Sequence, residues 1–251
     1  MTKINQYQTE SKKDNALLER GVFTFSLDFE LAWGTRGRPN AMHMPPFLDG
    51  TRKAVHGLLS LFEEHNVSAT WATVGAMLLG SEKNQNCCEK HSWLSGKTFD
   101  DIPAGDATTC PHWYAEDLVQ AIRACGVEQD IGCHTLTHGF VDPSPQGREP
   151  FRLELERSLK LFEEYGLGRP TSFIYPKAKM GHFDVLSELG FRSFRGPENK
   201  WFESLPGVKL PAALRLLDAK LAGKPKTEQP VYHEAGIWQI PSSQFYSPFF
   251  N

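Results

Sequence analysis

The sequence predicts an α/β fold in which parallel strands alternate with helices. Short apolar runs rich in β-branched and aromatic side chains recur along the chain, and segments with apolar residues at helical spacing lie between them. A regular alternation of this kind places helices outside a parallel sheet, either as a barrel or as an open doubly wound sheet. In both architectures the catalytic and binding residues lie at the carboxyl ends of the strands, so functional residues are expected there.

The first half of the chain predicts two strands and two helices. The first strand is GVFTFSLDF, residues 21–29, and a Gly- and Pro-rich loop separates it from an amphipathic helix. The apolar face of that helix comprises Val55, Leu58, Leu59 and Phe62. The next strand is expected over 67–75, and a polar, turn-rich segment follows over about 80–112. A helix over 114–126 then ends at a glycine suited to a C-cap.

The second half continues the alternation with four strands and three helices. The longest helix has an apolar face of Phe151, Leu155, Leu159 and Phe162. The strands are expected over 130–134, 171–176, 191–196 and 237–243, and the helices over 149–166, 182–190 and 210–223.

Composition excludes several classes of protein. The 27 basic and 30 acidic side chains give a net charge of -3, so no general basic field favours nucleic acid or an anionic membrane. Residues 1–20 are polar, without the apolar core of a signal peptide, and no later run approaches the length of a membrane span. We therefore expect a cytoplasmic protein with one domain over 21–251, and five reduced cysteines that show no CxxC spacing.

Acidic and imidazole side chains coincide at two predicted strand ends. Asp28 and Glu30 close the first strand, and His134 and His138 follow the third. Histidines four residues apart present two nitrogens to one ion if the chain begins a helical turn, and an acidic residue from another strand can complete the site. The alternatives are that the histidines are polar residues of a turn and that the carboxylates cap the next segment or pair with nearby arginines.

Three further side chains near these strand ends are candidates for function. Arg195 ends the fifth predicted strand, where it could bind substrate or neutralise Glu30. Trp33 and Trp71 could stack against a sugar ring, although a buried tryptophan more often belongs to the core.

Four segments of the chain resemble the polysaccharide deacetylase family, also called the NodB-homology domain, and most closely its cytoplasmic branch found with surface-polysaccharide biosynthesis. They are SLDFELAWG, ATWATVG, HTLTH and SFIYPKAKMGHFDVLSELGFRSFRG, and the match runs from about residue 21 to 243. HTLTH is the most specific, because it fits the family's His-(Ser/Thr)-x-x-His metal motif at every defined position. The resemblance implies a distorted (β/α) barrel of about six to seven βα units, a divalent metal, with zinc the favoured ion, and hydrolysis of an N-acetyl group on a sugar.

Carried over residue by residue, the resemblance makes His134 and His138 metal ligands and puts Asp28 at the position of the family's catalytic base. Phe29 stands where most members have the ligating aspartate. Glu30 could replace that ligand, as in branches with an acid-x-acid pattern, or Asp28 could bind the metal itself. Lys177 follows Pro176 where the family usually has an arginine beside proline, and it could orient the catalytic carboxylate, although it lacks the bidentate fork.

The residue types suit amide hydrolysis. A Lewis acid must polarise the carbonyl and lower the pKa of water toward about 7, a carboxylate must take the proton of water, and an acid must protonate the departing amine. The resemblance also calls for a later strand that ends in a histidine acid, and this chain stops eight residues after IWQIPSS. His233 precedes that strand and is a poor substitute.

The predicted function is therefore a metal-dependent deacetylase of an N-acylated sugar or polysaccharide precursor. The alternatives are a degenerate homologue that binds a glycan or a partner without turnover and a hydrolase of a small non-sugar amide. If the last strand is lacking, a barrel edge stays unpaired unless another chain covers it, as in a homo-oligomer.

Overall fold

The protein is described here by a computed structural model that covers residues 21–37, 45–80, 102–103, 105–197 and 227–243. Its centre is a sheet of seven strands in the order β1-β2-β3-β4-β5-β7-β6. Neighbouring strands are parallel except β6 and β7, which form an antiparallel pair. The strands are β1 (Phe25–Phe29), β2 (Ala69–Thr73), β3 (Asp130–Cys133), β4 (Ser172–Ile174), β5 (Ser193–Gly196), β6 (Val231–His233) and β7 (Ile237–Pro241).

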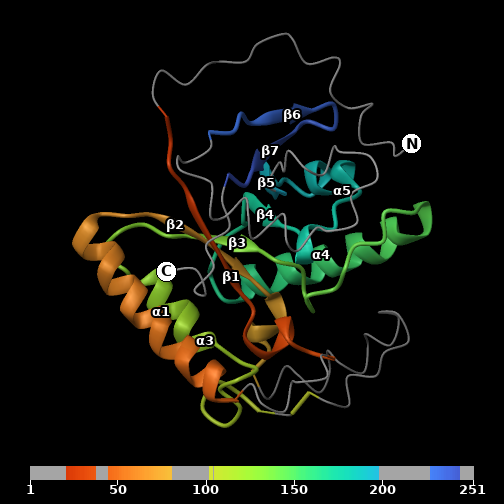
Figure 1. Cartoon of the computed structure of the whole chain (residues 1–251). Coiled ribbons are helices and arrows are strands. Elements are labelled where there is room, and N and C mark those ends of the chain that lie inside the picture. Colours follow the sequence, from red (N-terminus) through yellow and green to blue (C-terminus); the bar gives the residue numbers. More distant parts are fainter. Residues whose placement is uncertain (1–20, 38–44, 81–101, 104, 198–226, 244–251) are drawn as a thin grey trace, which may run out of the picture.

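Helices cover the sheet from outside, and α1 and α3 lie together on one flank (Figure 1). The apolar spacing seen in the sequence explains why they pack: α1 buries Val55, Leu59 and Phe62, and α4 buries Phe151, Leu155, Leu159 and Phe162. The α-helices are α1 (Pro45–His65), α3 (Glu116–Arg123), α4 (Arg148–Glu164) and α5 (Phe183–Glu188). In the part of the chain that is described, no helix is both long and apolar enough to span a membrane.

Short 3-10 turns follow several strands at their carboxyl ends. They reverse the chain at the rim of the sheet, so the residues just after each strand lie near one another. These turns are η2 (Leu31–Gly34) after β1, η4 (Gly75–Leu78) after β2 and η7 (Pro176–Ala178) after β4, with η6 (Pro145–Gly147) before α4.

The predicted fold class is confirmed. All six predicted strands are present, and the sheet curls as in a distorted barrel, because Arg195 on β5 reaches Ser26 and Asp28 on β1. The structure adds β6, which the sequence did not predict, as the antiparallel partner of β7. The helix expected over 210–223 and most of the excursion over 80–112 lie outside the described residues.

Candidate metal centre

The register of the first three strands brings Glu30 and His134 to one rim. Phe29 on β1 pairs with Thr73 on β2, which pairs with Cys133 on β3. Glu30 comes one residue after Phe29, and His134 comes one residue after Cys133. The parallel sheet therefore delivers a carboxylate and an imidazole to the same edge from segments far apart in the sequence.

His134 is fully buried and held at both its backbone and its ring. Its amide donates to the Thr73 carbonyl at 3.0 Å, and Nδ1 lies 2.8 Å from the Ile174 carbonyl on β4. Because a carbonyl only accepts, Nδ1 carries the hydrogen, and a neutral ring then presents the lone pair of Nε2. Nε2 has no hydrogen-bond partner and lies 3.5 Å from Oε2 of Glu30.

His138 reaches the same carboxylate by a turn rather than by a helix. Thr135 and His138 have φ of 63° and 58°, so the chain after β3 turns sharply and does not form the helical turn that would also have aligned the two histidines. Nε2 of His138 lies 2.9 Å from Oε2 of Glu30, and the two imidazole ring centroids are 5.0 Å apart. Both histidines thus face Glu30, as the spacing predicted, although the backbone that aims them differs.

Glu154 on α4 holds this turn from inside the protein. Its carboxylate accepts hydrogen bonds from the amides of Leu136 and Thr137 at 2.8 and 3.0 Å and from the Thr137 hydroxyl at 2.6 Å. Only 5% of Glu154 is exposed. Sequence reasoning missed this role, although a signal was present, because Glu154 lies three residues after Phe151 on the apolar face of the predicted helix.

Opposing effects set the ionisation of the two carboxylates. Burial raises the pKa of Glu30, but the two imidazole side chains beside it, His134 and His138, outweigh burial and lower the pKa to about 2. For Glu154 burial dominates and raises the pKa, against the hydrogen bonds from Thr137 and Leu136. Glu30 is therefore a carboxylate at neutral pH, which is the form that binds a cation.

Glycine at position 34 makes room for the Glu30 side chain. A Cβ at Gly34 would overlap the Glu30 carboxylate, which lies against the backbone of η2. The close approach explains why η2 carries a glycine where it passes the candidate ligand.

The three side chains have the chemistry of a zinc site. One oxygen of Glu30 and one nitrogen each of His134 and His138 lie within 4.8 Å of one another. Imidazole nitrogen and carboxylate oxygen are usual zinc ligands, and a backbone carbonyl on the second ring nitrogen is a common outer partner of a zinc-bound histidine. The buried, unpartnered Nε2 of His134 also fits, since such an atom is costly without a partner.

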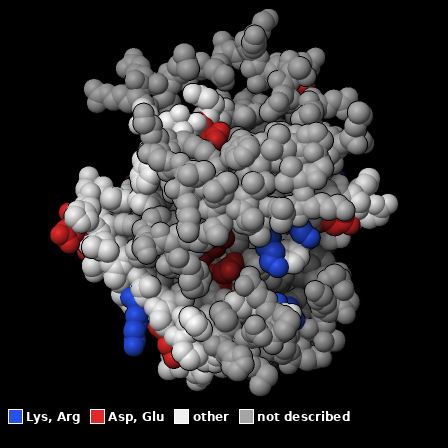
Figure 2. Space-filling view, in the orientation of Figure 1, with Lys and Arg blue, Asp and Glu red and all other residues white. Residues whose placement is uncertain are grey.

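Asp28 is two residues before Glu30 and pairs with Arg195. Nη2 of Arg195 donates to Oδ1 of Asp28 at 2.6 Å, and Nη1 donates to the Ser26 hydroxyl at 2.8 Å. The arginine therefore neutralises Asp28, and not Glu30, which was one of the two roles that the sequence left open for it. Figure 2 shows acidic atoms recessed in a hollow in the middle of one face, with basic atoms on its right side.

The remaining predicted residues lie elsewhere. Lys177 is exposed, with Nζ 4.4 Å from the centroid of the Phe140 ring, and no contact with Asp28 is found in the described part of the chain. Trp33 and Trp71 are 3% and 2% exposed, and their indole nitrogens donate to the Trp113 carbonyl and to Gln129. A sugar cannot stack on a ring buried to this degree, so both tryptophans act as core residues here.

His233 is likewise not among the side chains that gather around Glu30. It lies on β6, where Nε2 is 2.9 Å from Gln239 and the ring packs against Phe183 and Phe194. Its place on the antiparallel edge agrees with the expectation that it is a poor substitute for a catalytic acid.

Comparison with solved structures finds several deacetylases, each at low identity. A Mycobacterium smegmatis protein described as a polysaccharide deacetylase is 16% identical, with a TM-score of 0.45 over 70% of this chain and 50% of that one. The Streptococcus pyogenes deacetylase PplD, solved with acetate, is 8% identical, with a TM-score of 0.45 over 79% and 65%. A de-N-acetylase from Aggregatibacter actinomycetemcomitans is 14% identical, with a TM-score of 0.43 over 70% and 63%. This chain thus spans less than two thirds of each of these three proteins.

Comparison with families of known proteins gives a match over the middle of the chain, which includes β2, β3 and β4. No curated protein matches the chain. The family model for polysaccharide deacetylase matches residues 43–193, which include both histidines of HTLTH and exclude Asp28, Glu30 and Arg195. Since the match covers more than half of the 251 residues, the chain belongs to the polysaccharide deacetylase family.

Proposed function

We propose that this protein is a metal-dependent hydrolase that removes an N-acetyl or other N-acyl group from a sugar or polysaccharide precursor. The observation that carries the proposal is the buried Nε2 of His134, which faces Glu30 and His138 and has no hydrogen-bond partner. A divalent metal, with zinc favoured, would take Glu30, His134 and His138 as its protein ligands. The distances favour Glu30 over Asp28 as the acidic ligand, because Asp28 is engaged by Arg195.

The residues around the site suit the chemistry of amide hydrolysis. A bound metal would supply a Lewis acid that polarises the amide carbonyl and lowers the pKa of water toward about 7. Asp28 would take one proton from the attacking water, and Arg195 would hold the carboxylate in place for that transfer. The proton on Asp28 can then pass to the departing amine nitrogen, so a single carboxylate balances the proton transfer.

The substrate class rests on family membership and on the resemblance described above. The family acts on N-acetylated carbohydrate, and the resemblance to its cytoplasmic branch supports a surface-polysaccharide precursor as the substrate. The open position that such chemistry needs is consistent with three protein ligands, because catalytic zinc sites keep a fourth position for water or substrate.

Acetate release from a panel of N-acetyl sugars tests this proposal. We expect the zinc-loaded wild type to release acetate and Asp28→Asn to bind zinc equally well but to turn over roughly 100-fold to 10,000-fold more slowly, as expected when a general base is lost. His56→Ala on the exposed face of α1 is the matched control, with wild-type rates.

Three outcomes would contradict the proposal. Full activity of Asp28→Asn would remove Asp28 from the mechanism. Zinc binding without acetate release from any sugar would favour a homologue that only binds a glycan or a partner. Release of the acyl group from small non-sugar amides, and from no sugar, would favour a hydrolase of small amides.

A further inference from the structure

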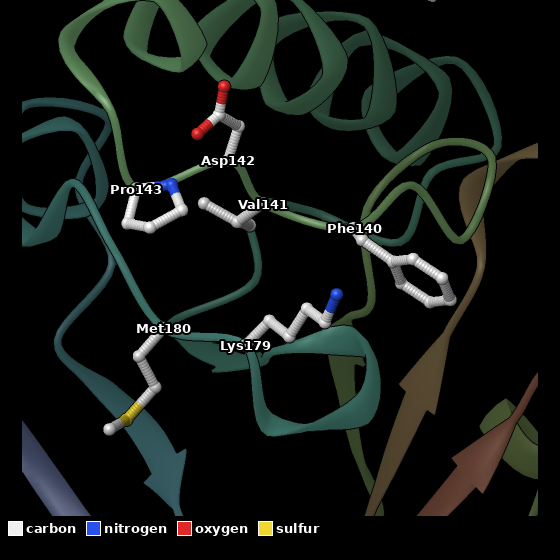
Figure 3. Close-up of a pocket in the computed structure, with 6 residues that line it drawn as sticks. All are labelled: Phe140, Val141, Asp142, Pro143, Lys179 and Met180. Carbon is white, nitrogen blue, oxygen red and sulfur yellow. The ribbon is translucent and has the colours of Figure 1, made fainter.

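A shallow, open cleft of about 530 Å³ lies next to Phe140, two residues after His138. We name it the Phe140 cleft, and it is lined by Phe140, Val141, Asp142, Pro143, Lys179 and Met180 (Figure 3). Its volume is in the range of small-molecule sites. Phe140 links it to the candidate metal centre, because the ring centroid is 5.9 Å from that of His138.

Two ammonium groups lie over the exposed Phe140 ring at one end of this cleft. Nζ of Lys177 is 4.4 Å and Nζ of Lys179 is 5.1 Å from the ring centroid, and Phe140 is 47% exposed. Among the described residues no carboxylate lies within ion-pair distance of either lysine. Two like charges over one ring repel each other, and an anion bound between them would offset that repulsion.

The one carboxylate in the lining is engaged elsewhere. Asp142 accepts hydrogen bonds from the amide and hydroxyl of Ser144 at 2.9 and 2.8 Å. Figure 3 shows its carboxylate directed toward the helix above, while the Lys179 side chain runs along the cleft toward Phe140. The positive charge at the Phe140 end is therefore available to a ligand.

The backbone that carries the lysines is held in an unfavourable conformation. Lys177 and Ala178 have φ of 51° and 53°, in the left-handed region that non-glycine residues seldom adopt. The surrounding loops are tied by a hydrogen bond from the Tyr175 hydroxyl to the Gly181 carbonyl at 2.7 Å and by His182 Nε2 on the Asp142 carbonyl at 2.7 Å. Strain that is maintained by such ties is common at ligand sites, where it orients side chains in advance.

We infer that the Phe140 cleft binds an anionic substituent, a phosphate or a carboxylate, on the N-acylated sugar. The two ammonium groups can donate charge-assisted hydrogen bonds to the anion, and their cation–π contacts with the Phe140 ring hold them close together. Because the Phe140 ring packs against His138, such a substituent would lie close to an N-acyl group bound at the candidate metal ligands. This inference rests on the proposed function for its choice of substrate and deepens it.

Steady-state kinetics on matched substrates test the inference. The substrates are N-acetylglucosamine, its 6-phosphate, its 1-phosphate and the corresponding uronic acid, assayed with wild type, Lys177→Gln, Lys179→Gln and the double variant. We expect the ratio of kcat/KM for one charged substrate over the neutral sugar to fall roughly fivefold to tenfold per lysine removed. Which substrate shows the drop distinguishes phosphate from carboxylate. Lys160→Gln on the exposed face of α4 should leave every ratio unchanged.

A binding measurement separates this inference from the proposed function. Calorimetric titration of the same four compounds into zinc-loaded Asp28→Asn needs no turnover, so it decides the inference even if acetate is never released. Tighter binding of a charged compound than of the neutral sugar, weakened by the lysine substitutions and by salt, would support the inference. Two results would overturn the inference. One is a difference of less than twofold in affinity between the charged and neutral compounds. The other is a difference of less than twofold between Asp28→Asn and the same protein with both lysines replaced.

Discussion

Replacing Glu154 with alanine should destabilise the fold and weaken metal binding together. The carboxylate is the acceptor for the amides of Leu136 and Thr137, which lie between the two histidines. Alanine leaves these amides and the Thr137 hydroxyl without that acceptor inside the protein. The turn that aims His138 at Glu30 then loses its support from α4.

The magnitude follows from the hydrogen bonds that are lost. A buried amide left without an acceptor costs about 1–3 kcal/mol, so two of them cost roughly 2–6 kcal/mol in the free energy of unfolding. Burial raises the pKa of Glu154, which means that its charge is itself unfavourable in the fold, so removing the charge returns part of this cost. We expect a loss of about 2–4 kcal/mol, a large share of the 5–15 kcal/mol typical of a domain.

Urea unfolding of the metal-free proteins at pH 7 measures the loss, and competition with a chromophoric chelator measures zinc affinity. Glu154→Gln keeps an acceptor for the two amides, so it should lose only about 1 kcal/mol. Glu156→Ala is the matched control on the same helix, since Glu156 is half-exposed and 3.8 Å from Arg152, and it should change stability by less than about 0.5 kcal/mol. If Glu154→Ala stays within about 0.5 kcal/mol of the wild type, the carboxylate does not support the turn, and this reasoning is refuted.

Further predictions concern Glu30 and Cys133. Gly34→Ala should displace the Glu30 carboxylate and weaken zinc affinity roughly tenfold or more in chelator competition. Gly50→Ala is the control, because a Cβ there meets open space and should leave zinc affinity unchanged. Equal zinc affinities of the two variants would contradict the close approach of Glu30 to Gly34. Because the pKa of Glu30 is lowered from 4.5 to about 2, its ionised form stabilises the metal-free protein above pH 4.5, and that stabilisation is lost as the pH falls toward 2. The stability gap between wild type and Glu30→Gln, measured by urea unfolding, should therefore be constant near neutral pH and close between pH 4.5 and 2, and a gap that stays open at pH 2 would count against the assigned cause. Burial raises the pKa of the Cys133 thiol to about 12, so Cys133→Ser and wild type should consume the same number of equivalents of a thiol reagent at pH 8, and one equivalent fewer in the variant would show that Cys133 is accessible.

The sequence predicted the rim of the sheet well because parallel strands have a simple geometric rule. Apolar runs marked the strands, and the rule that their carboxyl ends meet at one edge joined Glu30 to His134 and His138 before any contact was known. β6 was not predicted, because it is a three-residue edge strand with little buried surface and so has no apolar alternation to detect.

Features that depend on tertiary contacts could not be predicted in the same way. The pairing of Arg195 with Asp28 depends on how far the sheet curls to bring β5 toward β1, which strand patterns do not specify. Trp33 near the rim could face either solvent or core, and only the packing of Trp113 against it decides for the core. The left-handed residues Thr135 and His138 likewise depend on the acceptor that Glu154 provides, not on local propensity.

Metal analysis of the purified protein beside His134→Ala is the most direct test of the central claim. After loading with zinc and removal of the excess, the wild type and the His56→Ala control should each hold about one equivalent, and His134→Ala should lose it while staying folded by circular dichroism. A wild type without bound zinc, or a folded His134→Ala variant that retains its full equivalent, would contradict the assignment of Glu30, His134 and His138 as the metal site.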